Sequence, residues 1–191
     1  MQKTNFVQSA FASAKGSIIP LMVGVVIVGG VSVVAYRAIS PQQPLATFSE
    51  MLPVKATKGA TLSIDREEAE LGVMSVVDIR SADFRLRNTG SQPLEISQVR
   101  TSCMCTFAKI ETSNGQSPEF NMAMHNDATV NTWKGLVNPG EEAVVTVTYN
   151  PVLMPVEGSV ARNVKFATND PQNPIVELGV HATVQGGSLT R

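Results

Sequence analysis

The two cysteines of this 191-residue chain, Cys103 and Cys105, have the type and spacing best suited to chemistry. In an extended strand, residues two apart point to the same face, so both sulfur atoms could meet one metal ion or one reactant. A disulfide between them would close a very small ring, which would be strained and easily reduced. Four explanations stay open: two buried apolar side chains, a strained or transient disulfide, a soft-metal site, and a bridge to a partner.

A later run, Met122-Ala123-Met124-His125, adds side chains that could join the cysteines in a metal site. Thioether, thiolate and imidazole are the ligands that copper(I) favours. If this run folds back, the candidate copper ligands are Cys103, Cys105, Met122, Met124 and His125. Methionine and histidine are also ordinary loop residues. We therefore expect no cofactor, and copper is the alternative.

Motifs of common catalytic sites are missing from the sequence. It holds no G-x-S-x-G, H-E-x-x-H, P-loop or dinucleotide fingerprint, and no C-x-x-C-H for covalent haem. The second histidine, His181, falls on the polar side of a predicted strand and is expected to be solvated. The acidic stretch at 65–70 is typical of a solvated strand end or turn, with a calcium site as the lesser alternative. We expect a protein that is not an enzyme and has no small-molecule substrate.

These residues follow a segment with the length of a membrane span. The run from Gly16 to Tyr36 is uncharged and is flanked by Lys15 and Arg37. At about 1.5 Å per residue it would cover roughly 30 Å, the thickness of the hydrocarbon core of a bilayer. A secretory h-region is shorter, about 7–15 residues. The sequence therefore predicts a transmembrane helix at 16–37 that remains as a signal anchor in the lipid bilayer.

Charge beside this segment predicts its orientation. Lys3 and Lys15 precede it with no acidic residue, and basic flanks stay in the cytoplasm. We expect a single-pass protein of the bacterial inner membrane, with a cytoplasmic N-terminus and a periplasmic C-terminal domain. The net charge of −1 gives no indication of nucleic-acid binding.

The N-terminal segments also offer contacts to a partner. Residues 1–15 form a predicted cytoplasmic amphipathic segment, in which Phe6 and Phe11 share the apolar face. This segment would lie either on the membrane surface or against a partner subunit. Within the span, Gly24 and Gly29 would let another helix approach closely.

The rest of the chain is predicted to form one all-β domain. Residues 38–59 are rich in proline and are expected to be an extended linker, residues 60–185 are the domain, and 186–191 are a tail. Short runs of alternating apolar and polar residues indicate half-buried strands. Seven strands are predicted: 61–65, 79–88, 93–100, 103–110, 143–149, 160–168 and 175–184. This count and the absence of a long helical pattern favour a seven-stranded immunoglobulin-like sandwich.

The order of the turns and motifs carries a resemblance. The sequence contains, in order, Asn88-Thr89-Gly90, Ser102-Cys103-Met104-Cys105-Thr106, Pro139-Gly140-Glu141 and Asn169-Asp170-Pro171. Over roughly 60–185 it resembles a bacterial family of exported immunoglobulin-like domains of unassigned function, relatives of the Hydin-type domain. The resemblance implies a seven-stranded sandwich and no enzyme activity. The chain departs from the family pattern at Met104, where glycine is usual, and in an inserted loop at 111–134.

Together these features predict a non-enzymatic subunit. It would brace or cap the periplasmic face of a larger membrane protein complex, such as a respiratory or photosynthetic assembly. Aromatic side chains often anchor interfaces, so Phe120 and Trp133 of the inserted loop join the N-terminal contacts as expected interface residues. The alternative is a membrane-tethered periplasmic protein that handles copper or thiol redox chemistry through its cysteine pair. A third reading is a tethered adhesion module of the cell envelope.

Overall fold

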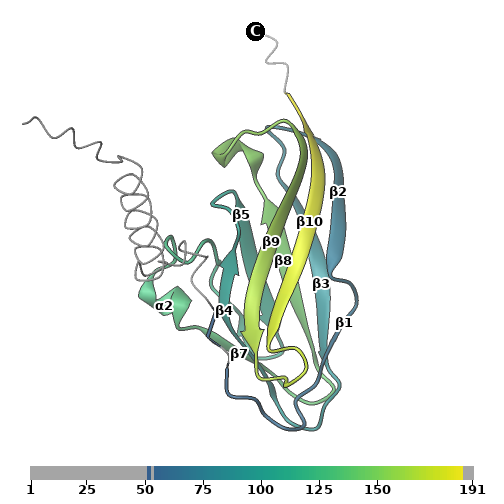
Figure 1. Cartoon of the computed structure of the whole chain (residues 1–191), viewed down its shortest axis with the longest axis vertical. Helices are drawn as coiled ribbons and strands as arrows, with labels where there is room; N and C mark the ends of the chain where they lie inside the picture. The colour runs from purple at the N-terminus through teal and green to yellow at the C-terminus, as the bar shows by residue number, and fades with distance from the viewer. Residues whose placement is uncertain (1–50, 53, 187–191) are drawn as a thin grey trace, which may run out of the picture. The chain divides into compact units, whose positions relative to one another are not determined.

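Two β-sheets stacked face to face form the part of the chain that the structure describes (Figure 1). The computed structural model describes residues 51–52 and 54–186. The predicted segments at 1–15 and 16–37 lie outside these residues, as do Phe6, Phe11, Gly24 and Gly29. No helix within 51–52 and 54–186 is long and apolar enough to cross a membrane.

One sheet has the strand order β1-β3-β8-β5-β6, and every neighbouring pair in it is antiparallel. Its strands are β1 (Leu62–Ile64), β3 (Arg80–Asn88), β5 (Thr106–Thr112), β6 (Gly115–Gln116) and β8 (Glu142–Tyr149). Strand β8 is central, with β3 on one side and β5 on the other. Loops that leave one end of β8 and the facing ends of its neighbours must therefore lie close together.

The second sheet has the order β2-β10-β9-β4-β7. Its strands are β2 (Glu68–Ser75), β4 (Leu94–Thr101), β7 (Lys134–Val137), β9 (Gly158–Thr168) and β10 (Ile175–Gln185). The edge strand β2 runs parallel to β10, whereas the other neighbours are antiparallel. The prediction of an all-β sandwich is confirmed, but the count of seven strands was wrong, because the described residues contain ten.

Alternating side chains fill the space between the sheets. Along β3, Phe84 and Leu86 are fully buried, while Arg85 and Arg87 face solvent. The second sheet meets them with its own inward residues, including Phe166 of β9. Successive side chains of a strand point to opposite faces, so a period of two yields one apolar layer and one wet face. This alternation made most strands predictable.

Strand β2 is the main element that the sequence prediction missed. Its first half belongs to the acidic stretch that was taken as a strand end or turn. Ala69, Leu71 and Met74 are buried, while Glu68 and Glu70 face solvent. The spacing changes between Leu71 and Met74 because the pairing of β2 with β10 shifts register there. The register shift broke the alternation that would have identified the strand.

The predicted inserted loop at 111–134 contains several short elements of secondary structure. It contains the end of β5, the short strand β6, the helix α2 (Ala128–Asn131) and the first residue of β7. Asp127 caps α2, because its side chain accepts a hydrogen bond from the amide of Val130 at 2.8 Å. The main chain of Phe120 pairs with that of Ala108 in β5. These contacts fasten the insertion to the edge of the first sheet.

Buried asparagines from two motifs of the sequence tie strands and turns together. The fully buried Asn88 donates from Nδ2 to the carbonyl oxygens of Gln92 and Val137, each at 2.8 Å. The buried Asn169 accepts from the amide of Glu95 at 2.8 Å and donates to the carbonyl of Pro93 at 3.1 Å. Buried polar groups are costly unless paired, so these residues specify the strand connections.

Asp170, beside Asn169, ties β1 to the turn between β9 and β10. Its Oδ2 accepts from the amide of Leu62 at 2.9 Å and from Asn173 Nδ2 at 2.8 Å, and its Oδ1 accepts from the amide of Gln172 at 2.8 Å. Burial by itself raises the pKa of Asp170, but these hydrogen bonds outweigh it and leave the pKa below its ordinary value. The charged carboxylate is therefore part of the folded structure.

Candidate functional site

The end of strand β8 brings three loops to the same end of the sandwich. Tyr149, its last residue, pairs with Arg80 at the start of β3 and with Thr106 at the start of β5. The loops before β3 (76–79), before β5 (102–105) and after β8 (150–157) therefore meet around Tyr149. The two cysteines lie in the second of these loops. Hydrogen bonds between loops hold them together: the amide of Asn150 donates to the carbonyl of Cys105 at 2.9 Å.

Cys103 and Cys105 are joined by a disulfide. The expected strand at 103–110 begins only at Thr106, because Cys103 to Cys105 lie in a turn. The turn brings the two Cα atoms to 5.1 Å, which lies within the range for a bridge. Of the four explanations left open by the sequence, the intramolecular disulfide is the state found here. Cys105 is fully buried and Cys103 is 8% exposed.

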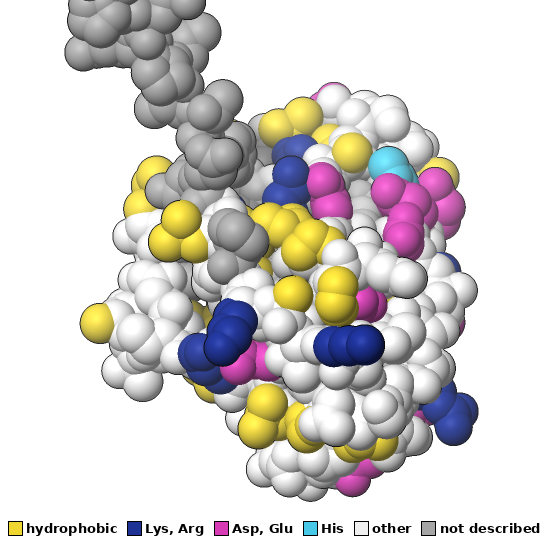
Figure 2. Space-filling view, turned by 60° about the horizontal axis from the view of Figure 1, so that its bottom comes forward, with side chains coloured by type: hydrophobic (Ala, Val, Ile, Leu, Met, Phe, Trp, Pro, Cys, Tyr) yellow, Lys and Arg dark blue, Asp and Glu magenta, His cyan; other side chains and the backbone are white. Residues whose placement is uncertain are grey.

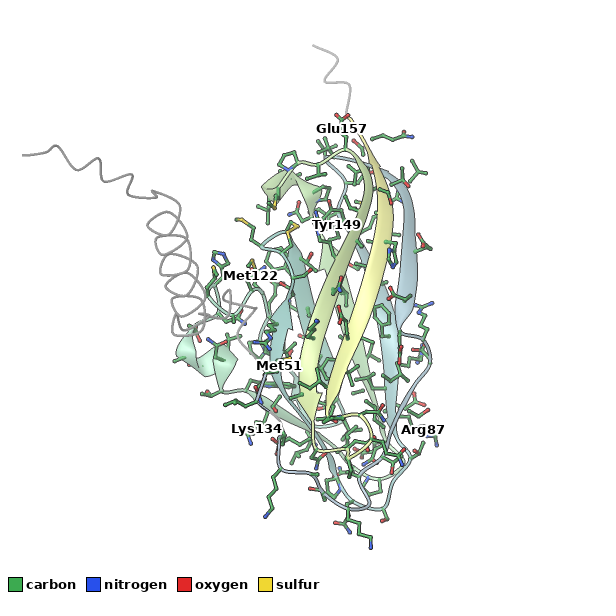
Figure 3. All side chains as sticks on the ribbon, in the orientation of Figure 1. Met51, Arg87, Met122, Lys134, Tyr149 and Glu157 are labelled. Atoms are coloured by element: carbon green, nitrogen blue, oxygen red, sulfur yellow. A yellow bond between two sulfur atoms is a disulfide. The ribbon has the colours of Figure 1, made fainter. Side chains whose placement is uncertain are left out.

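Methionine side chains surround this disulfide, and Figure 3 shows sulfur atoms gathered in the region between the labelled Met122 and Tyr149. The Sδ atom of Met154 lies 3.6 Å from Cys103 Sγ. Because a disulfide sulfur has no proton to donate, this is a contact between sulfur atoms. Met104, between the cysteines, and Met154 are each nearly half exposed. The site is thus a largely buried disulfide beneath accessible thioethers.

A guanidinium group approaches the other sulfur. Arg162 of β9 directs Nε at Cys105 Sγ, 3.3 Å away. Its Cζ lies over the ring of Tyr149, 5.4 Å from the centroid, and its Nη1 donates to the carbonyl of Ala161 at 2.8 Å. Arg162 is half-buried, and none of the ion pairs among the described residues includes it. A positive charge is therefore fixed beside a buried sulfur.

The predicted loop ligands lie near this site but are not joined to it. Asn121 holds the loop against the cysteine turn, because its Nδ2 donates to the carbonyls of Met104 and Thr106 at 3.1 and 2.9 Å. Met122 is half-buried, whereas Met124 and His125 are exposed. Within the described part of the chain no three histidine, cysteine or acidic residues form a metal-binding group. In the oxidised state the cysteines offer no thiolate to a metal.

Sequence reasoning missed Met154 and Arg162 as neighbours of the cysteines. Both are distant along the chain: 51 residues separate Met154 from Cys103, and 57 separate Arg162 from Cys105. The sequence did not single out Arg162, because β9 also carries the basic Lys165. Nothing in the sequence indicated which loop that strand would face.

The expectation that Phe120 would contact a partner was wrong, because its ring is fully buried in the core. Trp133 is half-buried and meets Phe120 edge-on, with ring centroids 5.2 Å apart. The indole also covers Gly135, where an added Cβ would lie 2.5 Å from Trp133 Cη2. These aromatics hold the insertion on the sandwich, with only part of the indole accessible.

Apolar side chains are instead exposed at the end that carries the disulfide. Seven large apolar residues of the three loops are 40–60% exposed: Val77, Ile79, Met104, Val152, Leu153, Met154 and Val156. These seven residues are called the apolar end below. The three loops contain no lysine or arginine, and their acidic residues are Asp78 and Glu157. The surface of these three loops is therefore mainly apolar, and the charged residues within the loops are acidic.

Other surface features are mixed in character. On the face shown in Figure 2, acidic, basic and apolar side chains are interspersed. His181 Nε2 lies 2.7 Å from Glu68 Oε2, so the predicted solvated histidine is partly exposed and paired. A groove of about 580 Å³ lies between residues 54–57, β4 and the segment at 131–134. Its lining mixes Glu95, Lys134 and amide side chains, and indicates no particular ligand.

Solved structures with similar folds are distant from this chain. A protein of unknown function from Porphyromonas gingivalis is 18% identical, with a TM-score of 0.47, and the match covers 72% of this chain and 51% of that one. The chain thus spans about half the length of that protein. The seventh PapD-like domain of human CEP192 is 12% identical, with a TM-score of 0.44 and coverages of 76% and 100%. A family 123 glycoside hydrolase from Clostridium perfringens is 7% identical, with a TM-score of 0.47 and coverages of 68% and 27%.

The curated proteins contain no match to this chain. A protein-family comparison matches one stretch, which runs from β1 to α2. This stretch contains two of the motifs noted in the sequence, Asn88-Thr89-Gly90 and Ser102 to Thr106, and ends before the other two. Residues 62–129 match the family described as "Protein of unknown function (DUF1573)".

Proposed function

We propose that this protein is a non-enzymatic, single-pass subunit of a larger membrane protein complex, and that its sandwich docks on the periplasmic face of that complex through the apolar end. The observation that carries this proposal is the gathering of seven exposed apolar side chains on three loops at one end. Fully burying an aliphatic side chain stabilises by about 1.5–3 kcal/mol, so covering even some of them favours association. The uncharged run at 16–36 supplies the anchor.

A protein surface suits the apolar end better than a lipid surface. Segments that enter the membrane interface combine apolar side chains with tryptophan, lysine or arginine. The three loops contain none of these, and the charged residues within them are the acidic Asp78 and Glu157. Methionine is enriched at protein interfaces, and two exposed methionines, Met104 and Met154, belong to these loops.

Substitution at the apolar end tests the docking. Val152 and Leu153 are 52% and 45% exposed, so changing both to Glu should leave the fold intact but place charges in the interface. After gentle detergent extraction, the full chain is expected to migrate with a larger assembly on native gels. The double variant should lose at least tenfold in this association.

A matched control uses exposed apolar residues elsewhere. Leu136 and Ile175 are 47% and 41% exposed and lie outside the three loops. Their replacement by Glu should leave the assembly unchanged. The proposal fails if the wild-type chain is only a 20.4 kDa monomer in every mild detergent, or if both double variants lose association equally.

A second candidate function is a membrane-tethered periplasmic protein that handles copper or thiols. The specific observation in its favour is the contact of Met154 with the Cys103–Cys105 disulfide, because two thiolates and a thioether would suit copper(I) after reduction. Changing both cysteines to Ser separates the two functions. Loss of copper tolerance or oxidase maturation with intact assembly would favour this second function, whereas loss of assembly would not.

A further inference from the structure

We propose that Cys103–Cys105 is a two-electron thiol–disulfide exchange site in which Arg162 stabilises the thiolate of Cys105. The inference does not depend on the docking function; it rests on the second candidate function, the handling of thiols, and specifies its chemistry. Three observations support it. The disulfide lies within a turn of three residues, the guanidinium of Arg162 lies 3.3 Å from Cys105 Sγ, and Cys103 is more exposed than Cys105.

The position of Arg162 fits the reduced state better than the oxidised one. A guanidinium is always charged, and an anion beside it is favourable. Arg162 has no carboxylate within 4 Å among the described residues; its Nε faces Cys105 Sγ, and its Cζ lies over the Tyr149 ring. A disulfide sulfur is neutral, but reduction would place a thiolate at this position. Adjacent positive charge favours a thiolate over a thiol.

The two sulfurs differ in the way that exchange requires. Cys103 is 8% exposed, whereas Cys105 is fully buried, so we assign Cys103 as the attacked residue. The amide of Cys105 donates to Cys103 Sγ at 3.1 Å and holds the attacked atom in place. Exchange is faster when the departing sulfur is a stable thiolate. Arg162 lies beside the departing sulfur, Cys105, and not beside the attacked one.

The reductant is a dithiol. One of its thiols first loses its proton to solvent, and the resulting thiolate attacks Cys103 Sγ and forms a mixed disulfide, while the Cys103–Cys105 bond breaks and its electron pair leaves with Cys105. The second thiol of the donor then loses its proton and attacks the donor's other sulfur, which is bonded to Cys103 in the mixed disulfide. This attack releases Cys103. The donor becomes a disulfide, Cys103 takes up one proton, Cys105 remains a thiolate beside Arg162, and one proton passes to solvent.

Met154 controls access to Cys103. Its thioether lies 3.6 Å from Cys103 Sγ and, at 48% exposure, can move aside without disturbing the core. It carries no charge and forms no bond in the exchange. Met154→Ala should therefore speed reduction severalfold while leaving the equilibrium with the dithiol unchanged. A structural role for this side chain would instead lower the melting temperature.

The equilibrium is measured with the full chain in detergent, in buffers of reduced and oxidised dithiothreitol or glutathione, by alkylation and mass spectrometry. Arg162→Gln should shift the equilibrium about tenfold or more toward the disulfide, since one unit of thiol pKa corresponds to a factor of ten. Arg162→Lys keeps the charge, so most of the shift toward the disulfide should be absent in this variant. Melting temperatures of all variants show whether folding contributes.

A spectroscopic measurement isolates the thiolate. In Cys103→Ser the remaining thiol is Cys105, and its ultraviolet thiolate absorbance gives its pKa directly. That pKa should lie below the ordinary value of about 8.5 and rise by about one unit or more in Cys103→Ser with Arg162→Gln. Equal pKa values in the two variants would overturn the role of Arg162.

A second result would overturn the whole inference. The folded wild-type chain should become reduced in millimolar dithiothreitol under native conditions. If it stays oxidised there, while the urea-unfolded chain is reduced in the same buffer, the bridge is structural. Docking is measured separately, by migration with the larger assembly on native gels, so the two proposals can fail independently.

Discussion

Gly90 lies where two connections of the sandwich pass within van der Waals contact. A Cβ added there would be 2.1 Å from the carbonyl oxygen of Gly59 and 2.7 Å from the amide nitrogen of Thr61. Both are main-chain atoms, so relief would require the strand connection to move. The glycine of the Asn88-Thr89-Gly90 motif is thus explained by close approach of the backbone, and not by any chemistry.

Gly90→Ala is expected to lower the free energy of unfolding by about 2–3 kcal/mol. Gly158→Ala is the matched control, because its Cβ would meet no atom within 4 Å and the cost comes only from its φ of +98°. That control should cost about 1 kcal/mol. Urea denaturation measures both, and equal losses would show that close packing at Gly90 has no effect.

Phe120 illustrates a residue whose role changed between sequence and structure. As an interface anchor it would contribute to association, but as a buried core residue it must contribute to stability. Phe120→Ala should therefore cost about 3–5 kcal/mol of unfolding free energy. The exposed Met124→Ala, in the same insertion, should cost less than about 0.5 kcal/mol. Thermal melts distinguish the two roles. If Phe120→Ala were as stable as the wild-type chain, the core role would be contradicted and the interface role favoured.

At the scale of elements, Asp170 joins β1 to the turn between β9 and β10. Its pKa is depressed in the folded state, so the stabilisation from its carboxylate is complete above the unfolded pKa of about 3.9 and is lost as the pH falls through the lower folded value. Glu177 adds to this loss in the same direction: burial raises its pKa, but Asn163 and Lys165 lower it further. The sandwich should become less stable below about pH 4.

Asp170→Asn tests that pH dependence. The variant keeps the size of the side chain but loses the charge that three donors require, so it should cost about 2 kcal/mol at pH 7. The gap between wild type and variant should narrow as the pH falls below about 4, because wild-type Asp170 then becomes protonated. Chemical denaturation at pH 7 and pH 3 provides the comparison; a constant gap would contradict the role of the carboxylate.

Elements with a strict period of two were predictable from the sequence. Strands β3 and β10 were predicted within one residue at each end, since their inward and outward residues alternate. Strand β2 was not, because acidic residues cover its exposed face and its register shifts against β10. The start of β5 was placed three residues early, because the cysteines form a turn stabilised by a bridge and not an extended strand.

At the scale of the whole molecule, membrane attachment rests on the uncharged run at 16–36. Replacing Val25 and Val28 by Arg would place two charges near its centre, at a cost of about 2.5–3.5 kcal/mol each for insertion. This variant should be released by alkaline carbonate, whereas the wild-type chain should stay with the vesicles. Val25→Leu with Val28→Leu is the matched control and should also stay. Wild-type release by carbonate would remove the anchor from the proposed function.

The sequence by itself determined most of the strands, their exposed and buried faces and the closeness of the two cysteines in one short segment, because these depend on neighbours within a few residues. Only the tertiary structure decided what surrounds the cysteines. Met154 approaches them from the neighbouring loop after β8, and Arg162 from β9 in the facing sheet, although 51 and 57 residues separate these side chains from their cysteines. Their positions follow from Tyr149 pairing with both β3 and β5 and from β9 lying over that end. Long-range register, which no local pattern encodes, therefore creates the candidate site.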